Sequence, residues 1–321
     1  MDTMRGVPDR GWEPGDVVIE LGRAGIDWDR ALVADASHLE ELVSSNPESV
    51  FWPLNYTFDG DPRSLLLSSV LEAIDAPFLG CNSDATRFTS KLQFTQALAA
   101  VGLRTAPKVP IDHPQRGLLS AFPVFVKNEF SCNSEGVLRV DDAECLSLAL
   151  RAMGQNHPDE QLYVEESYGD SEWTVAVVVV DGHPRTASMR LTPVESTYID
   201  AQAKQRNDLI RFEAPDGTIS AVLDHYVELA VAALELDGYF RVDVLLDNGE
   251  EPCAIDLNIL PFLTGPGPSL SYLPMAFMMA GASYSDVLGA VLASGCRRGS
   301  SIRPGSALHE YVHESRFLRH G

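Results

Sequence analysis

The chain is poor in basic residues and in cysteine. It carries 24 Lys and Arg against 46 Asp and Glu, which gives a formal net charge of −22 at pH 7. This balance argues against nucleic acid and anionic membranes as partners, because both need a basic face on the protein. The five cysteines are odd in number, widely spaced and without a CxxC pair. That usage is typical of reduced thiols in the cytosol.

Long apolar runs are also lacking. No run approaches the roughly 20 residues that span a bilayer. The first 15 residues are charged and have no apolar core, unlike a signal peptide. We therefore expect a cytoplasmic protein with no membrane partner. The 321 residues, 45% hydrophobic and 22% charged, form an ordinary globular mix that is long enough for about two domains.

The pattern of elements changes along the chain. Strands at 16–22, 48–56 and 76–80 are expected to alternate with helices at 36–45, 63–76 and 84–102, which predicts a small α/β layer. In the last helix Phe94, Leu98 and Val101 share an apolar face, and Gly102 can end it. Beyond this point four strands and one helix are expected up to residue 168. Two further strands, a helix at 223–236, a hairpin and helices at 273–282 and 284–293 follow, and the basic tail after 297 stays unassigned.

The clearest chemistry lies in the expected hairpin. Two strand-like runs, 239–246 and 252–258, flank an Asp-Asn-Gly turn that tolerates positive φ. Antiparallel pairing would place Asp243, Asp256 and Asn258 on one face. Two carboxylates and an amide oxygen suit Mg²⁺. A solvated hairpin is the commoner fate of Asp, but it does not explain acids among Phe, Val, Leu and Ile, because buried carboxylates need partners.

Two other segments are ambiguous when each is taken alone. Lys127 follows a strand and precedes a small-residue loop that can close over phosphates, yet an ordinary polar hairpin explains it as well. The acids Glu165, Glu166 and Glu172 lie at strand ends and can accept from an adenine amino group or ribose hydroxyls. A solvated turn is the default interpretation of that segment. A lone lysine in a helix or an irregular segment is likewise a solvated side chain by default.

The order of these motifs is more specific than any one of them. It resembles the ATP-grasp superfamily, and within it the D-alanine–D-alanine ligase branch, over residues 51–293. The best-matched stretches are APFLGCNSDATRFTSKLQFTQALAAVGLRTAPK, FPVFVKN…NSEGV, YVEESYGDSEWTV and YFRVDVLL…AIDLNILP. The resemblance implies a mixed α/β and α+β fold with three parts. These are an N-terminal α/β domain (1–88), a central ATP-lid subdomain (89–170) and a C-terminal catalytic subdomain with an antiparallel sheet (171–321).

The resemblance also implies roles for single residues. The nucleotide-binding positions are Lys91, Phe125, Lys127, Ser134, Gly136, Glu165, Glu166, Ser167, Tyr168, Glu172, Lys204 and Ile255. Two Mg²⁺ ions, or Mn²⁺ in their place, would be held by Asp243, Asp256 and Asn258. Arg241 would stabilise the oxyanion, Lys204 would reach the γ-phosphate, and Ser134 would lie in the closing loop. Asp256 is one methylene shorter than the Glu usual in the family.

The substrate-facing positions depart from the D-alanine pattern. Asn133 replaces a serine, Asn55-Tyr56 replaces His-Gly, and Phe262 lies where the family has Gly in Pro-Gly-Met-Thr. The serine that follows is displaced to Ser269 or Ser271. We therefore expect an ADP-forming ligase that joins amino-acid-like substrates other than the cell-wall pair in a specialised biosynthetic pathway. The alternatives are an authentic D-alanine–D-alanine ligase with a divergent pocket, or a non-catalytic nucleotide-binding protein. Relatives in this branch often form homodimers, so a homodimer is expected here.

Overall fold

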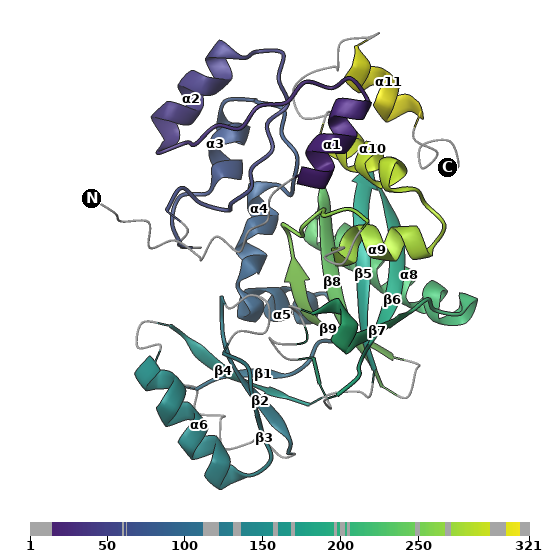
Figure 1. Cartoon of the computed structure of the whole chain (residues 1–321). Helices are drawn as coiled ribbons and strands as arrows, with labels where there is room; N and C mark the ends of the chain where they lie inside the picture. Colours follow the sequence, from purple (N-terminus) through teal and green to yellow (C-terminus); the bar gives the residue numbers. More distant parts are fainter. Residues whose placement is uncertain are drawn as a thin grey trace.

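The computed structural model describes most of the chain. The described residues are 15–59, 61, 63–111, 122–130, 136–156, 160–167, 171–195, 198–199, 203, 206–247, 251–266, 271–295 and 306–314. Five predicted site residues lie outside this set: Asn133, Ser134, Tyr168, Lys204 and Ser269. Figure 1 shows an N-terminal group of helices, a small sheet covered by one helix, and a larger sheet with helices on both faces.

The N-terminal part is more helical than expected. It holds α1 (Gly15–Arg23), α2 (Ala36–Ser45) and α3 (Leu67–Ala73). The strand expected at 16–22 is wrong, because Val17 and Leu21, four residues apart, are the two buried positions of a helix. The strands expected near 51 and 78 reduce to an isolated parallel bridge between Phe51 and Phe78. Two backbone hydrogen bonds of 2.9 and 2.8 Å hold this bridge.

The single helix expected at 84–102 is also wrong. The chain forms α4 (Ser83–Thr86), a 3₁₀ turn η1 (Arg87–Thr89) and α5 (Lys91–Ala100). Ser90 breaks the run, because its extended backbone makes it the N-cap of α5 and its hydroxyl accepts from the Gln93 amide. As a result Val101, expected on the apolar face, is 47% exposed. Gly102 ends the helix as expected, with φ +80°.

The small sheet, called here the lid sheet, is antiparallel with the order β1-β4-β2-β3. Its strands are β1 (Lys108–Pro110), β2 (Val124–Asn128), β3 (Leu138–Val140) and β4 (Leu162–Glu166), and α6 (Ala143–Asn156) covers it. One face is apolar and packs on α6 through Val124, Val126 and Val164. Strand alternation turns Lys108, Phe125, Lys127, Tyr163 and Glu165 to the other face.

The large sheet is antiparallel with the order β7-β6-β5-β8-β9. Its strands are β5 (Ser171–Val180), β6 (His183–Pro193), β7 (Ile210–Glu213), β8 (Tyr239–Asp247) and β9 (Glu251–Asn258). One face packs on α5 and α8 (Gly217–Leu234), and the other on α1, α9 (Tyr272–Met279) and α10 (Tyr284–Gly295). A last helix, α11 (Ala307–Glu314), packs on α10.

Some of these helices are apolar enough to resemble membrane spans. Among the described residues, α8 alone reaches that length and hydropathy, and α9 with α10 does so as a pair bent by 119°. The buried side chains of all three belong to the two cores that flank the large sheet. Packing on the sheet accounts for their composition.

Candidate active site

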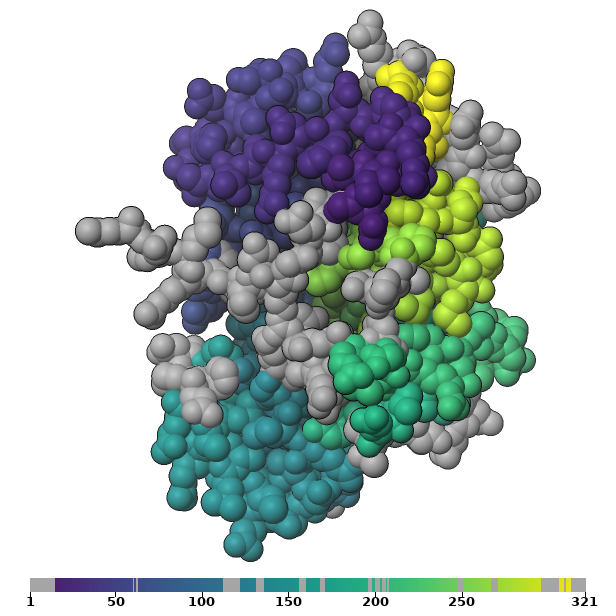
Figure 2. Space-filling view, in the orientation of Figure 1, coloured from purple at the N-terminus to yellow at the C-terminus, as the bar shows by residue number. Residues whose placement is uncertain are grey.

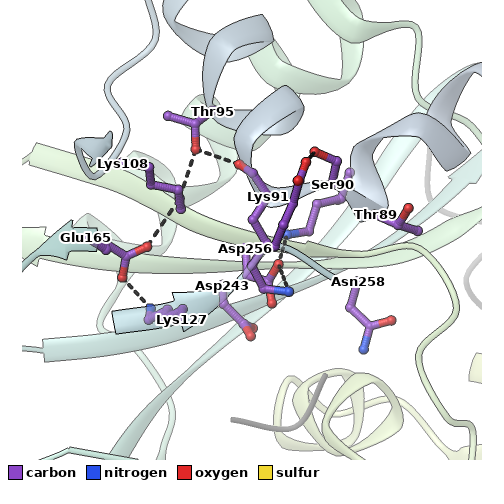
Figure 3. A network of polar contacts seen from close by, with 12 residues as sticks. Thr89, Ser90, Lys91, Thr95, Lys108, Lys127, Glu165, Asp243, Asp256 and Asn258 are labelled. Atoms are coloured by element: carbon purple, nitrogen blue, oxygen red, sulfur yellow. Dashed lines mark hydrogen bonds and ion pairs between the residues drawn. The ribbon is translucent and has the colours of Figure 1, made fainter. Parts of the chain in front are cut away.

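The polar face of the lid sheet lies opposite the β8–β9 hairpin and the start of α5. Figure 3 shows Lys108, Lys127 and Glu165 from the lid sheet near Lys91 of α5 and the acidic residues of the hairpin. In the space-filling view the lid-sheet residues form the lower lobe of the molecule, below the N-terminal helices and the large sheet (Figure 2). The charged residues that the sequence scatters from Lys91 to Asp256 are therefore gathered between two sheets.

The predicted antiparallel hairpin is confirmed. Asp243 lies directly opposite Asp256, and Arg241 lies opposite Asn258. The pairing shifts by one residue after Asp243, which is a β-bulge of the kind that re-aims side chains beside sites. Ile255 lies inside this bulge. The two carboxylates and the amide thus share one end of the hairpin, as the sequence indicated.

Asp243 is 5% exposed and fully engaged within the chain. Its Oδ1 accepts from Thr174 Oγ1 at 2.6 Å and from Arg241 Nε at 2.9 Å, and its Oδ2 accepts from Arg241 Nη2 at 3.1 Å. Burial opposes charge on Arg241, but Asp243 holds the guanidinium pKa above its usual value. Thr174, which lies opposite Asp243 in β5, was missed from the sequence because it falls inside a run of valines.

Asp256 and Asn258 complete the oxygen set. Lys91 Nζ lies 3.8 Å from Asp256 Oδ1, and Asn258 Oδ1 accepts from the Leu260 amide at 3.1 Å. Among the described residues no three His, Cys, Asp or Glu side chains gather into a metal site. The set here is two carboxylates and one amide oxygen, and these hard donors fit Mg²⁺. An ion bound here would share Asp243 with Arg241.

Lys91 is the first residue of α5, and its position depends on the cap before it. Ser90 hydrogen-bonds Glu129, a buried carboxylate just beyond β2, in addition to capping the helix. Lys91 is itself buried. The Ser90–Glu129 contact therefore joins the start of α5 to the lid sheet, which fixes Lys91 between the two walls of the site.

Glu165 is the centre of the lid-sheet cluster. Its Oε1 accepts a hydrogen bond from Lys127, and its Oε2 lies 3.3 Å from Lys108 Nζ but has no aligned hydrogen bond. Burial alone would raise the pKa of Glu165, and the two ammonium groups reverse this, so its pKa lies below the usual value. Lys108 is a residue that the sequence interpretation missed, since a lysine after Pro107 at a strand start carries no distinctive signal.

Other predicted nucleotide positions are placed around this cluster. The Phe125 ring packs edge-on against Tyr198 with centroids 5.5 Å apart, and Lys127 Nζ lies 5.5 Å from its centre. Glu166 ends β4, and the Ser167 amide donates to Pro123 O at 3.3 Å. Glu172 lies near the start of β5, half-buried, and Gly136, which was expected in the loop that closes over phosphates, adopts φ +64°.

The predicted substrate side shows a feature that sequence reasoning did not single out. Arg241 stacks on the ring of Tyr272 at 5.1 Å, and the Tyr272 hydroxyl is buried with no hydrogen-bond partner among the described residues. Burial raises the pKa of this phenol. The neighbouring Ser271 hydroxyl accepts from the Thr264 amide at 3.1 Å. Phe262 is 45% exposed.

A small pocket lies beyond the end of β9. It has a cavity volume of about 30 Å³, and its walls include Asn55, Tyr56, Cys81 and Leu260. Leu260 is two residues past Asn258, so the pocket adjoins the oxygen set of the hairpin. The lining residues are apolar or neutral and polar, with no charged side chain among them.

The chain was compared with protein families and solved structures. Residues 115–293 match the family described as D-ala D-ala ligase C-terminus. The fold is similar to a Bacillus anthracis D-alanine–D-alanine ligase complexed with ATP, with a TM-score of 0.69 and 18% identity over 88% of this chain and 90% of that one. It is also similar to the Enterococcus faecalis VanG D-Ala:D-Ser ligase, with a TM-score of 0.61 and 18% identity over 76% and 71%. A Coxiella burnetii D-alanine–D-alanine ligase gives 0.61 and 16% over 84% and 70%.

Proposed function

The chain belongs to the D-Ala–D-Ala ligase C-terminus family, and we propose that it joins the carboxylate of one amino-acid-like substrate to the amine of another. Membership makes it an ATP-grasp ligase of the ADP-forming kind that makes C–N bonds. The observation that carries the proposal is the polar cluster between the two sheets. It combines Lys91, Lys127 and Glu165 with the Asp243–Asp256 pair.

The nucleotide is ATP in this proposal. Lys91 from α5 and Lys127 from the lid sheet contact its phosphates from opposite walls, and Lys204 reaches the γ-phosphate. Phe125 and Glu165 lie at the adenine together with the backbone at Ser167 and Tyr168, and Glu172 lies at the ribose. The described lysines support this assignment because both hold carboxylate partners, Asp256 and Glu165, that a phosphate can replace.

Asp243, Asp256 and Asn258 would hold Mg²⁺. When bound, the ion neutralises phosphate charge and orients the γ-phosphate. The substrate carboxylate attacks the γ-phosphate, ADP leaves, and an acyl phosphate forms. The amine then attacks the acyl carbon, and phosphate leaves with the bonding electron pair as the amide forms. Arg241 donates to the oxyanion of that second step, and its ion pair with Asp243 keeps it charged and oriented for this task.

The pocket past β9 favours a substrate with a small, uncharged part. None of the described residues that line it is charged, so a charged group placed there would lose water without gaining a partner. The Tyr272 ring over Arg241 is a second element of the substrate side. We place the substrate's ionic groups toward Arg241 and its uncharged part in the pocket.

The test is a coupled assay of ADP and phosphate release with a panel of paired amino acids of both configurations. We expect Mg²⁺-dependent release that requires both a carboxylate and an amine donor, and a product of the summed mass less water. Turnover with D-alanine alone would instead establish a D-alanine–D-alanine ligase. Tight ATP binding without turnover on any pair would contradict the ligase proposal. The homodimer, also a proposal, is checked by light scattering.

A further inference from the structure

Lys108 is a lysine whose side chain is fully buried. It starts β1, opposite Glu165 on β4 in the register of the lid sheet. Its ammonium donates to Thr95 Oγ1 at 2.8 Å and lies 3.3 Å from Glu165 Oε2. A buried ammonium is costly unless it is paired, so its position calls for an explanation.

The cluster contains two ammonium groups for one carboxylate. Glu165 divides its oxygens between them, with Oε1 toward Lys127 and Oε2 toward Lys108. The two lysines differ in access: the Lys127 side chain retains 15% exposure and the Lys108 side chain has none. Lys127 can therefore reach a ligand, whereas Lys108 is confined beside Glu165.

Thr95 confines Lys108 further. The threonine hydroxyl accepts from the Lys108 ammonium and donates to the Lys91 carbonyl oxygen at 2.9 Å. Figure 3 shows this chain of contacts running from Lys91 through Thr95 and Lys108 to Glu165 and Lys127. Helix α5 thus holds the Lys108 ammonium in place while the outer lysine remains at the edge of the site.

We propose that Lys108 is a positioning residue: it is the permanent counter-charge of Glu165 and so allows Lys127 to leave Glu165 for a nucleotide phosphate. The inference rests on the proposed function, which assigns Lys127 to the phosphates. Without Lys108, transfer of Lys127 to a phosphate would leave a buried carboxylate with no cation beside it. With Lys108 present, Glu165 keeps one ion pair throughout.

The alternative is that Lys108 only braces α5 against β1. The two roles differ in what the second partner does. If Lys108 only braces α5 against β1, Lys108→Met loses that contact whether or not Glu165 is charged. A counter-charge becomes unnecessary once the carboxylate is removed, so Glu165→Gln should rescue Lys108→Met only if the charge is what matters.

The experiment measures dissociation constants of adenosine and of Mg·ADP by titration calorimetry on the full chain. The dissociation constant of adenosine divided by that of Mg·ADP isolates the contribution of the phosphates, because any loss at the adenine end affects both ligands and cancels. We expect the ratio to fall about tenfold in Lys108→Met and to return to within about threefold of wild type in Lys108→Met/Glu165→Gln. Thr95→Val, which removes the hydrogen bond but keeps the charge, is the matched control and should stay within about threefold.

Two results would overturn the inference. One is an unchanged ratio in Lys108→Met, and the other is a lowered ratio that adding Glu165→Gln fails to restore. If Lys108→Met does not fold, Lys108→Gln, which keeps a donor for Thr95 but removes the charge, carries the same expectation. Wild-type protein that binds no Mg·ADP would refute the proposed function itself. If the wild-type protein binds Mg·ADP but the ratio is the same in Lys108→Met, only the role of Lys108 is refuted.

Discussion

Asp243→Asn is the substitution that tests the hairpin site most directly. The carboxylate is buried and accepts from Thr174 and twice from Arg241. The amide keeps one oxygen but turns an NH₂ group toward an Arg241 donor. Breaking a buried ion pair costs about 3–5 kcal/mol. The Arg241 side chain retains 13% exposure and its stack on Tyr272, so we expect the lower end of that range.

The substitution should also lower activity, by a route separate from its effect on stability. The substitution removes a negative charge from the proposed Mg²⁺ ligands and releases Arg241 from its fixed orientation. We expect the Mg²⁺-dependent turnover of a protein that is still folded at 25 °C to fall by at least about 100-fold, the scale on which single electrostatic groups act in catalysis. The assay is ADP release at saturating ATP over a titration of Mg²⁺, with circular dichroism to confirm folding.

Thr174→Val is the matched control. It removes one hydrogen bond to the same carboxylate, worth about 1.5–3 kcal/mol, but leaves the charge in place. Its stability should therefore fall nearly as far as that of Asp243→Asn, while its turnover should stay within about tenfold of wild type. Wild-type rates in folded Asp243→Asn would refute the metal assignment. Equal losses in both variants would show that the carboxylate acts through packing alone.

Three further predictions follow from the same contacts. Ser90→Ala should lower stability by more than the about 1 kcal/mol that the α5 cap alone contributes, because the hydrogen bond to the buried Glu129 is lost as well. It should also raise the KM for ATP because Lys91 follows directly. Thermal melts and kinetics measure the two effects. The pKa of Glu165 in the folded protein lies below its unfolded value. Its contribution to folding stability is therefore complete above the unfolded pKa and is lost as pH falls through the folded pKa. Glu165→Gln should remove this acid-induced loss of stability, which thermal melts at a series of pH values measure. Tyr272→Phe removes a buried hydroxyl that has no hydrogen-bond partner among the described residues, so stability should not fall. The KM for the amine or the carboxylate substrate should change. A drop in stability with an unchanged KM would contradict this prediction.

The large sheet was predictable because its strands carry strong signals. The valine run of β5 and the Asp-Asn-Gly sequence between β8 and β9 indicate paired strands, but the register that joins Asp243 to Asp256 depends on the β-bulge, which the sequence does not reveal. The helix over 223–236 was recognised from its periodicity, but its true start at Gly217 is set by Asp216, whose carboxylate caps Thr218 and Ile219. A cap carries no periodicity, so it was overlooked.

The N-terminal errors have a common physical cause. The run at 16–22 contains apolar residues at both strand and helix spacings, and only tertiary packing shows that Val17 and Leu21 are the buried pair. In α5 the signal was present: Ser90 followed by Gln93 is the start of a capped helix. It was overruled by a longer apolar pattern that includes the exposed Val101.

The site was predictable by residue type and order but not by partnership. Lys127, Glu165, Asp243 and Asp256 were named from the chain, whereas the third charge of the lid cluster, Lys108, was not. A single lysine in a short strand is ambiguous until the sheet shows that it faces Glu165 with no solvent. The roles assigned by resemblance, and the division at residues 88 and 170, stay predictions.

The partnerships lead to one last prediction. Three of the described cations placed at the nucleotide or the oxyanion already hold an opposite charge: Lys127 with Glu165, Lys91 with Asp256, and Arg241 with Asp243. A phosphate that takes Lys91 and Lys127 leaves Asp256 uncompensated, while Glu165 keeps Lys108. A cation that takes Asp243 and Asp256 leaves Arg241 and Lys91 uncompensated. Only a polyanion and a cation together replace every pair.

Nucleotide and Mg²⁺ should therefore bind with strong positive coupling. We expect ADP to bind at least about tenfold more tightly with saturating Mg²⁺ than in EDTA, and Mg²⁺ to gain the same factor from ADP, because coupling is reciprocal. Removing one ion pair of the unliganded protein should weaken the coupling. Asp256→Asn removes the Lys91–Asp256 pair, so it should raise the affinity for ADP in EDTA and bring it closer to the affinity for ADP with Mg²⁺. Calorimetric titrations of ADP with and without Mg²⁺ measure this. Equal affinity in both conditions for the wild-type protein would show that the resident ion pairs do not oppose the ligands.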